Sequence, residues 1–354
     1  MNLTKNLTTI NGEDIISLTM CTAPLAGSGE RLSVELMSLG AGIRKIAMRR
    51  SNGSERLLTL SYQELNEYRV NGSLAGLTIG PNAGRVPAEN GLTANEGKNQ
   101  IHGGLHNIAT HNWELSEVKE KTGACEVVFQ TEQPDGLDGW PGNRSYLVTY
   151  RLEDSGILTI SYLADTDRET YINLTNHTYW LSDGLSLEVA GDRVCQNDES
   201  FLPVSVVELS DEASADTPSA YNTGLKDTDG QPLKLYSQKN REGIPFCEIP
   251  SRSVLNNGFI ISKESAAKVP HPAALLTYPD IDVELLTDAP ALVVYTGDYL
   301  DSSAELYDGS LSSPRIAFAL EAQEMATLQE RTRTLPSQPF ERTIQLCFKL
   351  NLPS

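Results

Sequence analysis

The sequence has little positive charge, few cysteines and no long apolar run, and each shortage excludes a class of protein. Its 354 residues include 28 lysines and arginines against 47 aspartates and glutamates, a formal net charge of −19. A surface of this sign repels nucleic acid and anionic lipid, so we expect neither as a partner. No stretch approaches eighteen uninterrupted apolar residues, so we expect no membrane-spanning helix. Small uncharged molecules are the easiest ligands for such a chain to accept.

The cysteines and the first residues favour a reducing compartment. The five cysteines are scattered and odd in number, and none forms a C-x-x-C pair or a zinc-like cluster. The opening residues, MNLTKNLTTINGEDIISL, lack the apolar core of a secretory signal. We therefore expect a cytoplasmic protein with free thiols.

Strand patterns dominate the chain, and long helical patterns are scarce. Apolar and polar residues alternate with period two in several segments rich in Val, Ile, Leu, Tyr and Thr: residues 31–40, 124–133, 144–153, 156–165, 185–192 and 342–352. Residues 61–70, SYQELNEYRV, predict one short helix. The pattern predicts an all-β protein, a large antiparallel β-sandwich or distorted barrel. No composition break marks a boundary, so residues 1–354 are interpreted as one domain, with long loops over 207–237 and 299–314.

Two of the five histidines lie in neighbourhoods that suggest a site. His102 precedes Gly103 and Gly104, which would let a ligand approach the backbone closely. His177 follows a run of asparagine and threonine and precedes Tyr179 and Trp180. Polar groups beside aromatic rings suit a sugar, whose hydroxyls need hydrogen bonds and whose C–H faces need flat apolar surface. An ordinary strand with a Tyr–Trp core pair explains the same pattern equally well. The other three, His106, His111 and His271, are interpreted as surface or core residues.

One carboxylate lies inside an apolar segment, where acidic residues are uncommon. Glu321 lies inside the apolar run IAFALEAQEM, and Gln323 lies two residues further on, so both should face the same side of a strand. Acidic residues are rarely buried without a partner or a purpose. A general base and a salt bridge at the rim of the sheet are both open interpretations.

Six segments, taken in chain order, resemble the aldose 1-epimerase (galactose mutarotase) family. They are LAGLTIGPNAGRV (74–86), LTANEGKNQIHGGLHN (92–107), DGLDGWPGN (135–143), TYINLTNHTYWLS (170–182), LTDAPALVVYTGDYLD (286–301) and IAFALEAQ (316–323). Each match is weak alone, but six in the right order are specific. The resemblance implies a galactose mutarotase-like β-supersandwich in a single domain, acting as a monomer or homodimer on a free sugar.

The resemblance also implies residue roles. Glu321 would be the general base and His177 the general acid, while the pocket would be lined by Asn82, Arg85, His102 and Gln323. Mutarotation removes the proton of the O1 hydroxyl and protonates the ring oxygen O5, so the ring opens and closes again on the other face. Positioned proton transfers suffice for this chemistry. We therefore expect no metal and no cofactor.

Three departures from the family pattern put the substrate in question. Pro81 and Gly84 replace an arginine and an asparagine of the early loop. An aspartate that often binds distal sugar hydroxyls is absent, and Asn256 or Asn257 stands in its place, with Asn256 taken as the substrate contact. The chain between Val86 and residue 92 is shorter than usual. All three leave the proposed acid and base intact.

Two rival functions remain open on the sequence. A hexose-6-phosphate 1-epimerase would need cationic side chains around the distal phosphate, and no cluster of Arg or Lys lies near the matching segments. A non-catalytic carbohydrate-binding protein would have no need of an acid–base pair.

Overall fold

The computed structural model describes residues 1–25, 28–87, 99–209, 225–239, 243–261, 269–325 and 333–351. Three sheets make up most of this structure, and every strand pairing in them is antiparallel. This confirms the all-β prediction. None of the helices in these ranges is long and apolar enough to cross a membrane.

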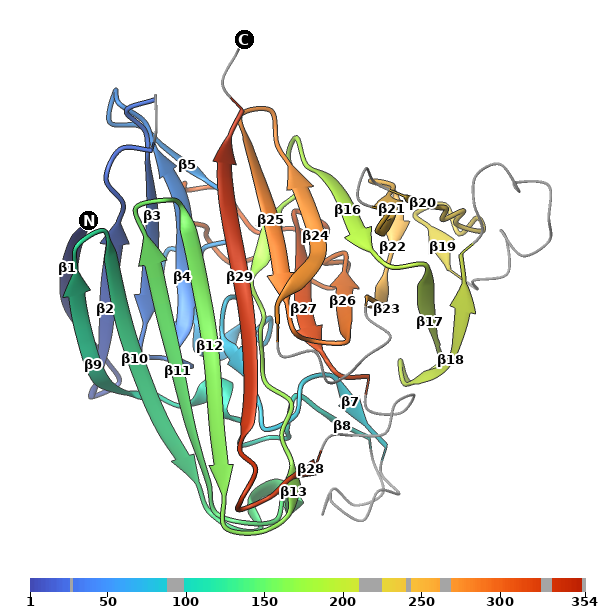
Figure 1. The fold of residues 1–354 in the computed structure, drawn as a ribbon, viewed down its shortest axis with the longest axis horizontal. Helices are drawn as coiled ribbons and strands as arrows, with labels where there is room; N and C mark the ends of the chain where they lie inside the picture. Colours follow the sequence, from blue (N-terminus) through green and yellow to red (C-terminus); the bar gives the residue numbers. More distant parts are fainter. Residues whose placement is uncertain are drawn as a thin grey trace.

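The largest sheet has ten strands. In spatial order they are β20 (Ser237–Lys239), β21 (Pro245–Ile249), β16 (Ser186–Ala190), β24 (His271–Thr277), β25 (Ile281–Thr287), β29 (Phe340–Leu350), β12 (Ile157–Thr166), β11 (Arg144–Glu153), β10 (Ala124–Gln133) and β9 (Glu114–Lys121). Its central strands alternate buried and partly exposed positions, as expected for a sheet with one face on a core. In Figure 1 these long strands stand side by side across the molecule.

Two smaller sheets complete the framework. The six-stranded sheet runs β15 (Tyr179–Leu181), β27 (Ala317–Gln323), β26 (Ala291–Tyr295), β23 (Asn256–Ile260), β17 (Arg193–Asn197) and β18 (Pro203–Glu208). The five-stranded sheet runs β1 (Asn2–Ile10), β2 (Glu13–Cys21), β3 (Arg31–Met37), β4 (Gly42–Arg49) and β5 (Glu55–Leu57). Figure 1 shows β1 to β5 at one side of the molecule and β17 to β22 at the other.

Side chains of the ten-stranded sheet reach both smaller sheets. The Trp180 ring of β15 packs 6.4 Å from the Phe348 ring of β29. The Tyr150 hydroxyl of β11 donates to the Ala41 carbonyl, 2.6 Å away, beside β4. One cluster of buried apolar residues, reaching along the chain from Leu18 to Phe348, fills the space between the layers. The arrangement is the predicted sandwich.

Short elements carry the connections. Four two-stranded ribbons pair β13 (Thr170–Tyr171) with β28 (Arg333–Thr334), β14 (Thr175–Asn176) with β6 (Thr78–Ile79), β19 (Lys226–Asp227) with β22 (Ser253–Val254), and β7 (Arg85–Val86) with β8 (Gln100–Ile101). The helical turns are α1 (Glu67–Val70), η1 (Ile108–Thr110) and η2 (Leu137–Gly139). The helix predicted over 61–70 therefore forms only in its last four residues. Part of the 207–237 loop and most of the shortened 86–92 segment lie outside the described residues.

Candidate active site

One face of the six-stranded sheet forms the floor of a cavity of about 430 Å³. Glu321 of β27 stands opposite Val293 of β26, which stands opposite Gly258 of β23. Tyr295 and Asn256 are opposed in the same way two residues along the same strands. Directly opposed residues point to the same face of a sheet. All five line the cavity, which explains how strands far apart in sequence bring them together.

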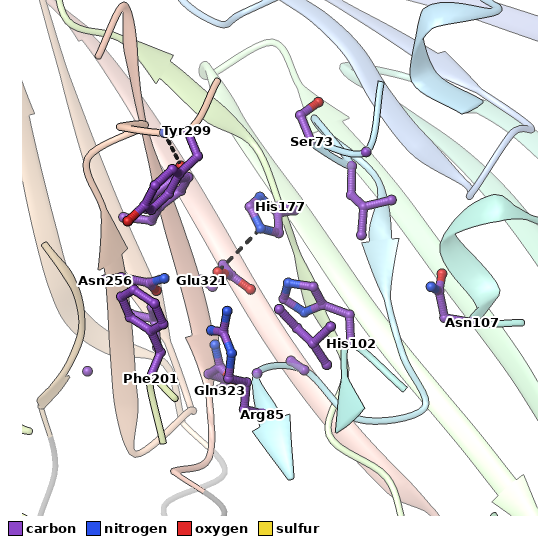
Figure 2. A pocket seen from close by; sticks show the side chains of 18 of the residues that line it. Ser73, Arg85, His102, Asn107, His177, Phe201, Asn256, Tyr299, Glu321 and Gln323 are labelled. Atoms are coloured by element: carbon purple, nitrogen blue, oxygen red, sulfur yellow. Dashed lines mark hydrogen bonds and ion pairs between the residues drawn. The ribbon is translucent and has the colours of Figure 1, made fainter. Parts of the chain in front are cut away.

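The opposite wall comes from short ribbons that bring three polar residues to the floor. Arg85 begins β7, His102 directly follows β8, and His177 directly follows β14. The amide of His102 donates to the Gly84 carbonyl at 3.0 Å, which fixes the turn. His102 has a φ of 53°, a left-handed conformation that few residues other than glycine adopt. All three line the cavity beside Glu321, as Figure 2 shows.

The centre of the cavity holds a carboxylate–imidazole pair. Nε2 of His177 lies 3.4 Å from Oε1 of Glu321, and both side chains are buried. The His177 ring stacks on Tyr179 with centroids 4.9 Å apart, and the His102 ring meets it edge-on at 5.4 Å. These two rings hold the imidazole plane, so the nitrogen that could transfer a proton stays aimed at the carboxylate.

Burial and charge set the ionisation of these groups. Burial raises the pKa of Glu321 above its ordinary value of 4.5, while His177 and Arg85 oppose the shift. Burial, reinforced by His177 and Arg85, lowers the pKa of His102 well below 6.5. His102 is therefore neutral near pH 7 and can both donate and accept hydrogen bonds. Burial also lowers the pKa of Arg85, against the attraction of Glu321.

Several buried polar atoms in the cavity wall have no hydrogen-bond partner among the described residues. They are Nδ1 of His102, Nδ1 of His177, Oε2 of Glu321, Nε2 of Gln323 and Oδ1 of Asn197. Buried polar groups are almost always paired, so a cluster of unpaired donors and acceptors marks a place for a ligand that supplies partners. The set contains both donors and acceptors, which suits a ligand rich in hydroxyl groups.

The structure brings together six of the seven residues predicted for the site. Glu321, His177, Arg85, His102, Asn256 and Gln323 all line the cavity. Asn82 does not line it, which contradicts its placement as a substrate contact. Its side chain is only 1% exposed, and Nδ2 donates to the Ala83 carbonyl at 2.7 Å, while its backbone bridges to Asn173. Its side chain is buried against the backbone of its own loop and does not reach the cavity.

The glycines of the site have roles that the sequence did not reveal. A Cβ added to Gly103 would lie 2.4 Å from Cδ of Pro81, so the close approach there is to the chain itself and not to a ligand. Gly84 has a φ of +71°, and an added Cβ would lie 2.7 Å from Oε1 of Gln323. The absence of a side chain at Gly84 therefore lets Gln323 reach the cavity wall.

Sequence reasoning missed part of the aromatic lining. Tyr295, Tyr299 and Phe201 all border the cavity. Tyr299 begins the loop predicted over 299–314, so its place on a long loop was a usable signal. Phe201 lies in the turn between β17 and β18, and no pattern in the sequence marks it.

His102, His177 and Glu321 also form a group that could hold a metal ion, since one ligand atom from each lies within 4.8 Å of the others. Two imidazoles and a carboxylate are common metal ligands. The expectation that no metal is needed therefore stays a prediction.

A large β-sandwich with a buried carboxylate–imidazole pair in a polar cavity fits the class of sugar isomerases that work by proton transfer. A family model described as aldose 1-epimerase matches residues 25–333, and the chain belongs to that family. The aldose 1-epimerase of Escherichia coli (strain K12) is 26% identical over 277 residues, which cover 75% of this chain and 76% of that protein. The galactose mutarotase of Homo sapiens is 26% identical over 315 residues, 86% of each chain.

A solved structure has the same fold. The galactose 1-epimerase of Lactobacillus acidophilus superposes with a TM-score of 0.73 at 23% identity, covering 99% of both chains. The protein is accordingly an isomerase of the mutarotase kind, and the resemblance found in the sequence is confirmed.

Proposed function

We propose that the enzyme interconverts the α and β anomers of a free, uncharged aldose such as galactose or glucose, with Glu321 as general base and His177 as general acid. The observation that carries the proposal is the buried pair at 3.4 Å, surrounded by unpaired polar atoms. A sugar hemiacetal places O1 and O5 on one carbon, so two neighbouring groups can serve both oxygens. Arg85, His102, Asn256 and Gln323 would hold the remaining hydroxyls.

The reaction follows from this arrangement. The Glu321 carboxylate takes the proton of the O1 hydroxyl as the His177 imidazolium gives its proton to O5. The C1–O5 bond breaks, C1=O1 forms, and the open-chain aldehyde rotates about C1–C2. In closure His177 takes the proton of the O5 hydroxyl, O5 attacks the other face of C1, and Glu321 returns its proton to O1. Each positioned transfer contributes roughly 100- to 10,000-fold.

The electrostatics of the cavity suit these roles. A carboxylate with a raised pKa is a stronger base than an exposed one, and Arg85 helps to keep it ionised. His102, whose pKa is lowered, stays neutral and leaves the acid role to His177. A neutral imidazole beside the pair can still bind a sugar hydroxyl.

An uncharged substrate is favoured over a sugar phosphate by the lining of the cavity. Arg85 is the only lysine or arginine among the described residues that line it. Recognition of a phosphate commonly uses several charge-assisted hydrogen bonds. The hexose-6-phosphate alternative therefore has little support in the described part of the site, and a non-catalytic binding protein would have no use for the buried pair.

The test is polarimetry of freshly dissolved α-D-galactose and α-D-glucose. Wild-type enzyme should speed the change in rotation, and Glu321→Gln and His177→Asn should each lower kcat by about 100-fold or more. The matched controls His106→Asn and Glu305→Gln, which lie outside the cavity lining, should leave the rate unchanged. Addition of EDTA should also leave it unchanged.

Three outcomes would count against the proposal. Full activity in Glu321→Gln would show that Glu321 is not the general base. Loss of activity in EDTA that zinc restores would show that His102, His177 and Glu321 hold a metal ion. Acceleration restricted to glucose 6-phosphate would favour the phosphate alternative.

We also propose that residues 1–354 form one domain, acting in the cytoplasm as a monomer or homodimer with no nucleic-acid partner. The largest cluster of buried apolar residues draws on the chain from Leu18 to Phe348, which supports one domain. The five cysteines are all unpaired, which supports a reducing compartment. The net charge of −19 disfavours nucleic acid.

A further inference from the structure

The side chain of Arg85 is long, flexible and weakly anchored. It starts in the two-residue strand β7, and among the described residues no hydrogen bond or ion pair fixes its guanidinium. Its charge nevertheless acts on Glu321 and His102 in the cavity. A side chain with several rotatable bonds loses conformational entropy when it is held in one direction. A contact of another kind is therefore needed to keep the guanidinium in the cavity.

The ring of Phe201 provides such a contact. The guanidinium carbon of Arg85 lies 5.0 Å from the centroid of this ring. A cation is attracted to an aromatic face within about 6 Å of the centroid, and the flat guanidinium of arginine suits this contact. Figure 2 shows Phe201 on one side of Arg85 and His102 on the other. Phe201 therefore supports the guanidinium from the side away from His102.

The turn that carries Phe201 is held in an uncommon conformation. Phe201 lies between β17 and β18 with a φ of 60°, in the left-handed region that bulky side chains rarely adopt. Oδ1 of Asp198 accepts from the Ser200 amide at 2.8 Å and from the Leu202 amide at 2.9 Å. The Phe201 amide donates to the Asp198 carbonyl at 3.0 Å. Strain of this kind persists only where the surrounding bonds maintain it, and here they place the ring against Arg85.

The turn is also tied to the floor of the cavity. Strand β17 pairs with β23, and Nδ2 of Asn197, at the end of β17, donates to the Asn256 carbonyl at 2.6 Å. Asn256 belongs to β23, in the same sheet as Glu321. The turn thus has a fixed position relative to the sheet that carries Glu321, and so does a group that packs against its ring.

Phe201 lies at the rim of the cavity and outside the core. It lines the active-site cavity and an adjoining cavity of about 450 Å³, and 38% of the residue is exposed. It belongs to none of the three clusters of buried apolar residues. Loss of its ring should therefore leave the fold intact, so that substitution tests the contact with Arg85.

We propose that Phe201 is a positioning residue for Arg85, whose guanidinium it holds in the cavity beside the sugar and Glu321. Phe201 acts on the reaction through Arg85, so loss of its ring has no effect once the guanidinium is gone. An aliphatic side chain cannot replace it, because the attraction comes from the negative face of the aromatic ring. This inference rests on the proposed function and adds a residue to the site.

A double-mutant cycle on kcat/KM tests the inference, with galactose and glucose as substrates. Phe201→Leu should lower kcat/KM about five-fold, the scale of a lost contact between a cation and a ring, and Arg85→Met should lower it at least as much. In the Arg85→Met background, Phe201→Leu should cause a further change of less than about two-fold. Phe201→Tyr and Phe201→Trp keep a ring and should stay within about two-fold of wild type.

Tyr307→Leu is the matched control. Tyr307 is 39% exposed, its ring centroid lies 4.0 Å from Nζ of Lys45, and it lines neither cavity. The variant therefore loses a comparable contact between a ring and a cation away from the site, and it should keep the wild-type kcat/KM. A loss in Tyr307→Leu equal to that in Phe201→Leu would show a general effect on the fold and would contradict the inference.

The two proposals fail in different ways. If wild-type enzyme accelerates neither sugar, the proposed function fails, and the same cycle is measured by calorimetry on the Kd of galactose in a Glu321→Gln background. If wild type is active but Phe201→Leu costs the same factor with and without Arg85, the inference is overturned and the proposed function stands. An equal loss of affinity with and without Arg85 would overturn it in the calorimetric cycle. The inference is also wrong if Phe201→Tyr and Phe201→Trp lose as much activity as Phe201→Leu.

Discussion

Burial and charge act on the pKa of Glu321 in opposite directions. Removal from water favours the protonated acid, while the imidazole of His177 and the guanidinium of Arg85 favour the carboxylate. If Glu321 is the base, as we propose, it must be deprotonated to act, and this balance would set the lowest pH at which the enzyme works. Arg85 would therefore act on the ionisation of Glu321 in addition to its proposed contact with the sugar.

Arg85→Met should move the acid limb of the kcat/KM profile to higher pH. Removal of the positive charge leaves burial less opposed, so the pKa of Glu321 rises and more alkaline solution is needed to ionise it. Arg85→Lys keeps the charge and should hold the limb near its wild-type position even if KM rises. The measurement is kcat/KM by polarimetry from pH 4 to pH 8.

The outcome separates charge from contact. An acid limb that stays in place in Arg85→Met, with kcat/KM lowered equally at every pH, would show that Arg85 only binds substrate. Lys5→Met, on the exposed strand β1, removes a charge far from the cavity lining and should change neither the limb nor the rate.

For single residues, the sequence could predict which face a side chain points to wherever spacing along a strand decides it. Glu321 and Gln323 are two apart on a strand, so period two alone places them on one face, and both line the cavity. Asn82 has no such constraint, because its direction depends on a single bridge to Asn173 that no pattern reveals. Phe201 depends on a turn conformation that is rare for its residue type.

Between elements, one arginine ties the two layers together behind the site. Arg342 of β29 is buried, and Nη1 donates to the carbonyl of Ala322 at 3.2 Å, next to Glu321. It also donates to the carbonyl of Leu174 at 3.4 Å, three residues before His177. Its charge is matched by Asp288 at 3.4 Å. The arginine thus ties together the segments that carry the proposed base, Glu321, and the proposed acid, His177.

Arg342→Met should lower kcat about ten-fold or more with little change in KM, since small displacements of reacting groups are costly. It should also lose ~3–5 kcal/mol of stability, the cost of breaking a buried ion pair. Polarimetry and urea denaturation measure the two effects. Lys45→Met is the matched control, because Lys45 is a buried cation that pairs with Glu55 at 3.1 Å. It lines neither the active-site cavity nor the adjoining cavity of about 450 Å³.

The control distinguishes positioning from stability. Lys45→Met should lose stability while keeping kcat. If Arg342→Met loses stability alone, the arginine is structural. Arg342→Lys, which keeps the charge, should recover part of the lost kcat and part of the lost stability. It replaces Arg342→Met in the test if the methionine variant does not fold.

Alternation of apolar and polar residues predicts strands with one buried face, and it does not predict strands without one. Alternation located 124–133 and 144–153 with the observed bounds of β10 and β11. Strand β1 is exposed along most of its length, so its sequence shows no alternation of apolar and polar residues. It is extended because it pairs with β2. Strand β27 is buried at all seven positions, so its sequence is largely an apolar run without alternation. Its pairing with β26 and β15 fixes it as a strand.

On the scale of the whole molecule, the class of fold followed from the strand patterns, but the assembly of the site did not. The cavity joins β7, β8 and the end of β14 to a sheet whose strands come from residues 179 to 323. Such non-local register is not written in any local window of sequence. The overall charge is a property of the same scale, and it has a consequence for the approach of substrate.

A net charge of −19 creates a field that acts on charged substrates and leaves uncharged ones unaffected. Between 0.01 and 0.15 M salt the screening length falls from about 30 to about 8 Å, so repulsion of an anion weakens strongly over this range. For a free aldose, kcat/KM should therefore change less than about two-fold, whereas any residual activity on glucose 6-phosphate should rise with salt. Polarimetry at a series of potassium chloride concentrations measures both. If kcat/KM for the free aldose rises several-fold with salt, the step that limits it involves a charged species. If the activity on glucose 6-phosphate is high and falls with salt, a cationic site attracts the anion against the overall field.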